Sequence, residues 1–412
     1  GEVYPTTILI LGGGASGMTA ALAASECGRH RVVLVERQAR LGRKLLATGN
    51  GRCNLTNTHA DGDSYHGADP AFCRPALEAF PVADTLDYFH RLGLLTVTEP
   101  SGRVYPYSDQ ANSVLDVLRF ALEQAGVEVH TGCEVRKIWK RRDGFLLKWD
   151  GGEAAGDKLI LAAGGAAGAK LGGTTLGYDL LEALGHKSTA LHPALVQLCT
   201  EGTFTRGLKG VRANGRVTVL RGSRALAVAE GEIQFTETGV SGPAIFEISR
   251  AVSTGGDGLT LSLNLLPQFS KETIVMLLQT RCAQLPDRPA EDLLTGMVHN
   301  RLGKLLGKAA GIGAEERLNT LGPDRLDRLA DTIGELRLTV TGTMGMDNAQ
   351  VTVGGVETAG FDPQTLESRT VPGLYACGEV LDIDGDCGGY NLQWAWSSGR
   401  LAGLSASKET EE

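Results

Sequence analysis

The stretch "TTILILGGGASGMTAALAASECGRHRVVLVER", residues 6–37, contains the pattern that decides the fold. An apolar run leads into Gly12-x-Gly14-x-x-Gly17, an alanine-rich segment follows, and a second apolar run ends at Glu36. This order predicts a strand, a helix and a second strand, in which Gly12 permits a tight turn, Gly14 lets a pyrophosphate approach and Gly17 lets helix and strand pack closely. We therefore expect a Rossmann-like α/β domain that binds a dinucleotide.

The residues around this turn indicate which nucleotides fit. The amides at the start of the predicted helix, at Ala15 and Ser16, face the phosphates. Glu36 lies 36 − 17 = 19 residues after Gly17, where a carboxylate accepts hydrogen bonds from a ribose diol. A carboxylate disfavours a 2′-phosphate, so FAD or NAD is favoured over NADP.

Two later segments favour FAD. "DKLILAAGGAA" (157–167) predicts a strand that ends in small residues, where a chain can pass close under a cofactor. "VPGLYACGEV" (371–380) predicts another strand, and its Gly378-Glu379 end is similar to a second FAD fingerprint. No second strand-GxGxxG-helix unit is found. We therefore assign the fingerprint to non-covalent FAD, with NAD(P)H as a transient electron donor.

Composition narrows the function classes. The chain has 412 residues, and its net charge is 40 − 48 = −8 without a long basic run, so no nucleic-acid partner is expected. The eight cysteines form no C-x-x-C pair, so neither a dithiol site nor a metal site is indicated. No run reaches the ~18 apolar residues of a membrane span. We expect a cytoplasmic protein without a membrane partner and predict no oligomeric state.

Five ordered blocks resemble a known family: "GRKLLATGNGRCNLTN" (42–57), "GRVYPYSDQA" (102–111), "FTETGVSGPAIFEIS" (235–249), "AQVTVGGVET" (349–358) and "GLYACGEVLDIDGDCGGYNLQWAWSSGRLAG" (373–403). The chain is similar to the BaiN-like family of bacterial NAD(P)/FAD-dependent oxidoreductases. The resemblance implies a flavin domain built from both ends of the chain, with a β-barrel and a helical subdomain inserted. It also implies reductase activity, since members are linked to enone reduction on steroid-like bile acids.

Three positions depart from the family pattern. Leu176 stands where the family usually has an acid, Glu237 where it often has His, and Cys387 where Thr is common. The first departure bears on a contact beside the flavin. The other two bear on the type of substrate more than on cofactor binding.

The remaining sequence agrees with an inserted region. Short β-prone runs parted by glycine turns occupy about 195–265 and predict a barrel or sandwich, and residues 271–329 show apolar positions at i, i+3 and i+4. We assign the FAD-binding domain to residues 1–190 and 336–412, the barrel-like domain to 191–268 and the helical subdomain to 269–335.

By analogy with related flavoproteins, the loop at 42–57 lies near the flavin ring. Its polar groups can donate to the ring, and the alternative is a solvent loop with Asx turns. Cys53 could exchange electrons with a flavin, but without a partner cysteine a small packed side chain is favoured. The candidate cofactor-binding residues are Gly12, Gly14, Ala15, Ser16, Gly17, Glu36, Arg37, Arg43, Lys44, Asn50, Gly51, Arg52, Cys53, Asn54, Val135, Ala163, Gly164, Gly378, Glu379, Gly388, Gly389, Tyr390, Asn391 and Leu392.

The block at 385–403 predicts a helix whose first amides bond the flavin pyrimidine. A side chain at Gly388 or Gly389 would keep the ring away. Trp394 and Trp396 lie two apart and face different sides of the helix, so we expect one in the core and one against the inserted domain.

The candidate catalytic residues are Tyr105 and Tyr390 as proton donors and Arg103 as an orienting cation, with packing between domains as the alternative. We expect an FAD-dependent oxidoreductase that passes hydride from NAD(P)H through FAD to an electron-poor C=C bond of a small organic substrate. Two alternatives stay open: a dehydrogenase or oxidase of an amine or C–H donor, and a flavin-binding accessory protein without turnover.

Overall fold

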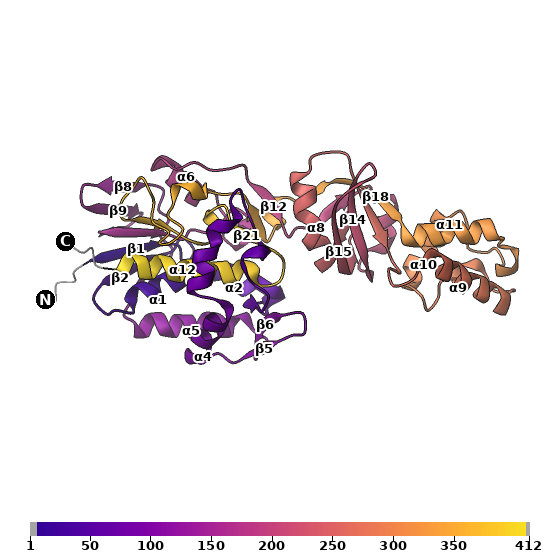
Figure 1. The fold of residues 1–412 in the computed structure, drawn as a ribbon, viewed down its shortest axis with the longest axis horizontal. Coiled ribbons are helices and arrows are strands. Elements are labelled where there is room, and N and C mark those ends of the chain that lie inside the picture. Colours follow the sequence, from indigo (N-terminus) through magenta and orange to yellow (C-terminus); the bar gives the residue numbers. More distant parts are fainter. Residues whose placement is uncertain (1–5, 409–412) are drawn as a thin grey trace. The chain divides into compact units, whose positions relative to one another are not determined.

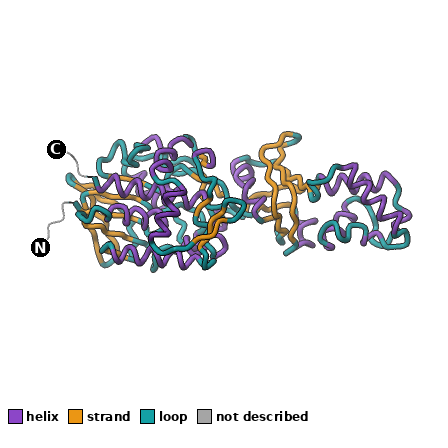
Figure 2. Tube along the Cα trace, turned by 60° about the horizontal axis from the view of Figure 1, so that its bottom comes forward, coloured by secondary structure: helices purple, strands orange, loops and turns teal. Residues whose placement is uncertain are grey.

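The computed structural model describes residues 6–408, which divide into two compact units. The first unit joins the described residues up to His192 with those from Val351 onward, and the second spans Pro193–Gln350. Figure 1 follows the chain through these units, and Figure 2 separates helices, strands and loops. Each unit has its own hydrophobic core.

The first unit contains the following helices and strands: β1 Thr7–Leu11, α1 Ala15–Ser25, β2 Arg31–Val35, α2 Arg43–Ala47, β3 Thr56–Asn57, β4 Tyr65–His66, α3 Arg74–Ala79, α4 Val82–Arg91, β5 Thr96–Thr98, β6 Arg103–Pro106, α5 Ala111–Gln124, β7 Glu128–His130, β8 Ile138–Arg141, β9 Gly144–Trp149, β10 Gly152–Gly156, β11 Lys158–Leu161, α6 Leu176–Ala183, β19 Val351–Val353, β20 Leu374–Ala376, β21 Asp384–Gly385 and α12 Tyr390–Ser407. The short strand β12 (His192–Ala194) lies at the boundary between the units.

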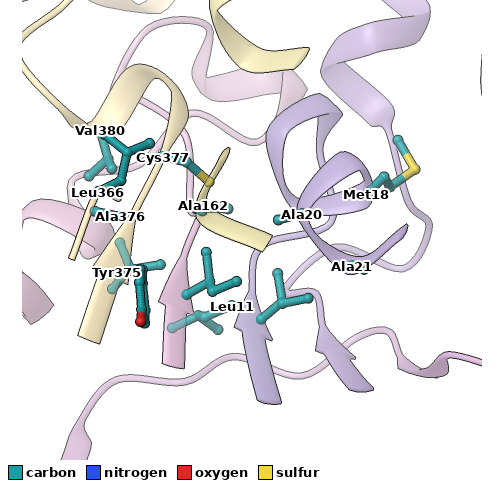
Figure 3. Packing of buried hydrophobic residues seen from close by; sticks show 14 of the residues in the cluster. Leu11, Met18, Ala20, Ala21, Ala162, Leu366, Tyr375, Ala376, Cys377 and Val380 are labelled. Carbon is teal, nitrogen blue, oxygen red and sulfur yellow. The ribbon is translucent and has the colours of Figure 1, made fainter. Parts of the chain in front are cut away.

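A five-stranded sheet with the order β20-β11-β1-β2-β7 is the centre of this unit. All neighbouring strands in it are parallel, and in β1 Leu9 pairs with Val33 on one side and Leu159 on the other. The inner strands β1, β2 and β11 are largely apolar runs because both faces of a parallel sheet are covered, whereas the edge strand β7 is polar and partly exposed. Figure 3 shows Leu11, Ala162 and Tyr375 in the core that results.

Helices α1 and α12 pack against each other although one lies near each end of the chain. Their close approach depends on small residues of α12. A Cβ atom at Gly399 would lie 2.4 Å from the Ser16 carbonyl oxygen, and one at Gly403 would lie 2.3 Å from that of Ala20. Only hydrogen fits at these positions, so the two helix backbones can touch.

The second unit contains a closed barrel with the strand order β13-β16-β15-β14-β17-β18 and a group of helices. Its elements are β13 Leu198–Thr200, α7 Gly202–Thr205, β14 Arg212–Arg221, β15 Arg224–Phe235, β16 Gly239–Ser241, α8 Pro243–Thr254, β17 Leu259–Asn264, α9 Lys271–Gln284, α10 Asn300–Ala309, α11 Pro323–Gly334 and β18 Leu336–Thr343. The expected α/β class, with a barrel and helices inserted in a Rossmann-like domain, is confirmed.

Two sequence-based expectations differ from the structure. We placed residues 336–350 in the flavin domain, but β18 pairs with β13 and β17 and closes the barrel, so that segment lies in the second unit. The assignment of separate barrel and helical domains stays a prediction. We also expected one tryptophan of α12 to face the inserted domain. Trp394 and Trp396 are instead both buried in the first unit, where their indole N–H groups donate to the carbonyls of Gly378 and Leu55.

Candidate functional site

Four strands of the parallel sheet end at the same edge, and each is followed by a predicted site residue. Gly12 follows β1, Glu36 follows β2, Gly164 comes after β11 and Glu379 after β20. These residues are up to 367 positions apart in sequence (379 − 12). Because the carboxyl ends of parallel strands meet at one edge, where open α/β sheets bind ligands, this edge is the candidate site.

The three glycines of the first turn have different surroundings. A Cβ atom at Gly12 would lie 2.1 Å from the Ala162 carbonyl oxygen, and one at Gly17 would lie 1.7 Å from that of Gly12. At Gly14, by contrast, a Cβ atom would meet nothing within 4 Å. Gly12 and Gly17 therefore serve close packing within the protein, and Gly14 faces open space beside the start of α1.

The carboxylate of Glu36 is fixed by backbone donors. The amides of Gly13 and Gln38 donate to its two oxygens at 2.9 and 2.6 Å. Each oxygen keeps acceptor capacity, so a diol can still bind. The next residue, Arg37, donates to the Gly172 carbonyl at 2.8 Å and so links the end of β2 to the loop that contains Gly172.

The two cations expected near the cofactor are engaged by side chains. Lys44 and Glu379 form an ion pair at 2.8 Å, in which Glu379 also accepts from the Thr352 amide. Arg43 donates to the side chain of Gln38 at 2.7 Å. The Lys44–Glu379 pair links α2 to the end of β20 across the candidate site.

Arg52 is paired with two carboxylates, so its guanidinium is not free to donate hydrogen bonds to a flavin ring. Its guanidinium pairs with Asp109 at 2.5 Å and Glu99 at 3.6 Å and lies 4.0 Å from the centre of the Tyr105 ring. The hydrogen bond to Asp109 raises the pKa of Arg52. Tyr105 itself is only 7% exposed, so packing accounts for its position.

Cys53 and Asn54 lie side by side in the chain but differ in what they offer. Burial raises the pKa of the Cys53 thiol to about 12, so the side chain is neutral at physiological pH and acts as a packed residue. Asn54 is 9% exposed, and its Oδ1 has no hydrogen-bond partner among residues 6–408. A buried amide oxygen without a donor is costly unless a bound group supplies one.

The start of α12 shows why the glycine doublet is there. Gly389 has φ 101°, and a Cβ atom there would lie 2.4 Å from the Thr56 carbonyl oxygen and 2.9 Å from Asn54 Oδ1. A Cβ atom at Gly388 would lie 2.8 Å from Nε of Arg103. The bare backbone is thus required by the protein's own packing, which sequence reasoning attributed to a flavin ring. Asn391 fixes the same turn, exchanging hydrogen bonds of 2.8 and 3.0 Å with the backbone of Gly385.

Polar groups gather around Tyr390. Burial and the nearby Asp386 carboxylate raise the pKa of its phenol, which keeps the proton in place. Arg103, which also acts on Tyr390, donates to the Cys387 sulfur at 3.9 Å. The structure therefore brings two of the three candidate catalytic residues, Tyr390 and Arg103, into one cluster.

Sequence reasoning missed two members of this neighbourhood. The Tyr65 hydroxyl donates to the Tyr390 carbonyl at 2.7 Å, and the ring nitrogen Nε2 of His66 pairs with Asp386 at 2.6 Å. Strand β4 brings them there by pairing with β21. A two-residue strand leaves no periodicity, so no sequence signal could have located them.

The remaining predicted residues occupy varied places. Ala15 and Ser16 form the first turn of α1, Ala163 follows β11, and Gly378 begins a 3₁₀ turn against Ser16. Asn50 and Gly51 have positive φ in an exposed turn. Val135 is buried in the hydrophobic core, and Leu392 packs against that core from α12.

Three groups near the carboxyl edge of the sheet are suited to FAD. Gly14 and Gly164 both face open space, one at each of two adjacent strand ends, and Asn54 offers an unsatisfied amide near the start of α12. The first amides of α12 have no intrahelical partner. These groups fit the phosphates and the polar ring edge of FAD.

Among residues 6–408, no helix has the length and apolar character needed to cross a membrane. In the same part of the chain, no group of three or more His, Cys, Asp and Glu side chains is arranged to hold a metal ion.

Comparison with known proteins gives a family match over most of the chain. The family described as "HI0933-like protein Rossmann domain" matches residues 6–405. The curated "3-dehydro-bile acid delta(4,6)-reductase" of Clostridium scindens is 40% identical over 403 residues, which cover 97% of this chain and 98% of that protein. The "Ribosomal RNA dihydrouridine synthase" of Escherichia coli is 33% identical over 393 residues, or 95% of each chain.

Among solved structures, a 3-ketosteroid delta1-dehydrogenase from Sterolibacterium denitrificans aligns with 98% of this chain and 100% of its own. Its TM-score is 0.48 at 14% identity. The expected absence of a nucleic-acid partner finds no support in the comparisons, since one named relative acts on ribosomal RNA.

Proposed function

Because the chain belongs to the HI0933-like family, we propose that it is an FAD-dependent oxidoreductase that reduces an electron-poor C=C bond with electrons from NAD(P)H. The family membership confirms the resemblance expected from the sequence blocks, and with a curated reductase 40% identical, the expectation of an oxidoreductase enzyme is confirmed. FAD, the donor and the substrate belong to the proposal.

The observation that carries the proposal is the set of groups at the carboxyl edge of the sheet. Gly14 and Gly164 leave room at neighbouring strand ends, and Glu36 presents a fixed carboxylate at the next one. A pyrophosphate and a ribose need this combination. In the proposed complex, Asn54 and the first amides of α12 hold the polar edge of the ring.

When bound, FAD would supply the hydride chemistry between NAD(P)H and the C=C bond. The protein would supply binding, orientation and the proton. Tyr390 fits the role of proton donor because its phenol carries a proton at neutral pH and lies in a cluster with the Arg103 cation. Arg103, in the same cluster, would orient a carbonyl or anion of the substrate.

Tyr105 supports the proposal less well as a proton donor. Its ring is 7% exposed and is covered by the Arg52 guanidinium at 4.0 Å. Between the two phenols, the structure favours Tyr390 for the proton and Tyr105 for packing.

The substrate class follows from the relative's name. A 3-dehydro bile acid with delta(4,6) unsaturation has its C=C bonds conjugated to a ketone, and conjugation makes such a bond electron-poor. We infer an enone-type small organic substrate for this chain.

A second candidate substrate is uracil in ribosomal RNA, favoured by the relative that is 33% identical over 95% of the chain. Dihydrouridine is uridine with its ring C=C bond reduced, and that bond is also conjugated to a carbonyl. The two candidates share the chemistry and differ in the size and charge of the substrate.

The test is anaerobic mixing of flavin-loaded protein with NADH and, separately, NADPH. Flavin absorbance should bleach within seconds for one of them, and bleaching with neither would reject the NAD(P)H-linked reductase. Reoxidation by a panel of enones, by uridine-containing RNA and by air then separates the two substrates from an oxidase. Protein that binds no flavin on reconstitution would overturn the proposal as a whole.

The assignment of Tyr390 as the proton donor is tested by comparing two Tyr→Phe variants. Tyr390→Phe should lower the rate of enone reduction by about 100-fold while flavin reduction by the nicotinamide continues. Tyr105→Phe is the matched control and should change either rate less than threefold. Equal effects of the two variants would contradict the assignment of the proton to Tyr390.

A further inference from the structure

The charged residues of one short basic segment have no role in the proposed reaction, although the segment includes Val135, a predicted cofactor-binding residue that is buried in the core. Residues 134–150, "EVRKIWKRRDGFLLKWD", contain six cations and three carboxylates, a local charge of 6 − 3 = +3 in a chain whose net charge is −8. The segment covers β8 and β9, which form an antiparallel hairpin. We call residues 134–150 the basic hairpin; β8 and β9 are labelled in Figure 1.

A groove of about 510 Å³ lies against this hairpin. It is lined by Gly132, Glu134, Arg136, Lys137, Trp139, Lys148, Trp149 and Asp150. Trp139 is 42% exposed, and the ammonium groups of Lys137 and Lys148 lie 3.6 and 5.5 Å from the centre of its ring. The groove thus combines an exposed indole with two adjacent cations.

Most cations of the basic hairpin are not neutralised within the protein. Arg136 pairs with Glu134 at 3.3 Å, and Lys140 donates to two backbone carbonyls of the hairpin turn. The other four are exposed, and no carboxylate of residues 6–408 forms an ion pair with them; they are Lys137, Arg141, Arg142 and Lys148. Like charges held this close repel one another, so a bound anion would relieve the repulsion.

The pairing of exposed aromatic surface with unneutralised cations fits one class of ligand. Single-stranded nucleic acid presents phosphates at regular spacing and unpaired bases that stack on aromatic side chains. A membrane surface would meet the cations, but it would not need a groove with two indoles. An acidic protein would meet the cations without the stacking.

We propose that the basic hairpin binds single-stranded nucleic acid, with a base against Trp139 in the groove and phosphates on Lys137, which lines the groove, and on Arg141 and Arg142 at the hairpin turn. The net charge of the whole chain, −8, concealed the local positive charge of the hairpin. For this reason no nucleic-acid partner was expected from composition. The proposal does not depend on the proposed reaction, because binding is measured without turnover.

The test measures fluorescence anisotropy of labelled 20-mers, oligo(U) and oligo(dT), mixed with the purified protein at several salt concentrations. The variant Lys137→Gln/Arg141→Gln/Arg142→Gln should weaken binding of oligo(U) at least tenfold at 50 mM salt. Loss of three phosphate contacts should lower the steepness of log K against log[salt] by about 2. Oligo(dT) binding as tight as oligo(U) would assign the site to either strand type, and tighter oligo(U) binding would assign it to RNA.

Two controls keep the result specific. Lys304→Gln/Lys308→Gln/Arg328→Gln removes the same charge from exposed cations of α10 and α11 and should change binding less than twofold. Trp139→Ala should weaken binding about tenfold, and Trp139→Phe should restore most of it, because a phenyl ring still stacks. Circular dichroism and urea denaturation confirm that each variant is folded.

Several outcomes would overturn the proposal. These are no binding of either oligonucleotide at 50 mM salt, equal losses in the two triple variants, or an unchanged affinity in Trp139→Ala. Binding of phosphatidylserine vesicles that depends on the hairpin cations, without binding of oligonucleotides, would assign the surface to a membrane instead.

Discussion

The two glycine turns of the candidate site look alike in sequence and differ in what they make room for. In the first turn, Gly14 borders open space, where a Cβ atom would meet nothing within 4 Å. In the second, a Cβ atom at Gly389 would lie 2.4 Å from the carbonyl oxygen of Thr56. A bare backbone at a binding site can therefore serve a ligand or the protein itself. Sequence alone does not separate the two uses.

The first turn contains both uses within six residues. Gly17 packs against Gly12, whereas Gly14 lies between them and touches nothing at the Cβ position. The same Gly→Ala substitution at Gly17, Gly389 and Gly14 therefore distinguishes glycines that serve packing from glycines that leave room for a ligand.

The largest effect is expected at Gly17→Ala. Its methyl group would lie 1.7 Å from the Gly12 carbonyl oxygen, so α1 must move away from β1. We expect a loss of about 3 kcal/mol or more in the free energy of unfolding, measured by urea denaturation. Gly307→Ala on α10 is the control, since that helical glycine has nothing within 4 Å and alanine favours a helix. A Gly17→Ala protein as stable as the control would contradict the packing role.

Gly389→Ala should have the next largest effect. The methyl group meets the Thr56 carbonyl, and φ of 101° is itself unfavourable for alanine, so we expect a loss of about 2 kcal/mol. Gly126→Ala isolates the conformational part, because Gly126 has φ 72° with nothing within 4 Å. If the two variants lose equal stability in urea, the contact with Thr56 is unimportant.

Gly14→Ala should act on the ligand alone. Gly14 has φ −85°, which alanine adopts readily, and open space at its Cβ, so the flavin-free protein should keep its stability within about 0.5 kcal/mol. Under the proposed function, the methyl group occupies the cofactor's space and raises the Kd for FAD about tenfold, or 1.4 kcal/mol. Flavin titration by fluorescence measures this change, and an unaltered Kd would show that the space is not the cofactor's.

The smallest effect is a difference in thiol reactivity between the two turns. Cys377 adjoins Gly378, which packs against Ser16 near the first turn, and Cys53 adjoins Asn54 near the second. Burial raises the pKa of each thiol to about 12 from an ordinary 9.0, so both should resist iodoacetamide at pH 8 while exposed Cys27 reacts. In Gly389→Ala, mass spectrometry should find faster labelling of Cys53 than of Cys377. Equal rates would mean that the strain spreads through the whole unit.

The same shifts fix the direction of a pH effect. Above pH 9.0 the unfolded chain loses these thiol protons, whereas the folded chain keeps them until about pH 12. Stability from these residues is therefore complete below pH 9 and declines as pH rises toward 12. A double Cys53→Ala/Cys377→Ala variant should lose stability less steeply over that range.

Much of the first unit could be predicted because its signals are local. The β1–α1–β2 pattern, the glycine spacing and Glu36 all lie within one 32-residue stretch, and the apolar runs of β11 and β20 are visible without context. The arrangement around Tyr390 could not be predicted, since it depends on β4 pairing with β21 some 320 residues away (385 − 65). Our assignment of β18 to the flavin domain was also wrong, because the sequence of a strand does not determine which sheet the strand joins.

The packing of α12 on α1 has a consequence for how the protein is made. Residues near both ends of the chain form the candidate site, and Gly399 and Gly403 must press on Ser16 and Ala20 for it to close. On a ribosome, the last residue of α1 is added 374 residues before Gly399 (399 − 25 = 374). During the synthesis of the whole inserted unit, β1, α1 and β2 therefore remain without α12, and the apolar face that α12 later covers stays exposed. That exposed face makes the incomplete chain prone to aggregation until α12 has been made.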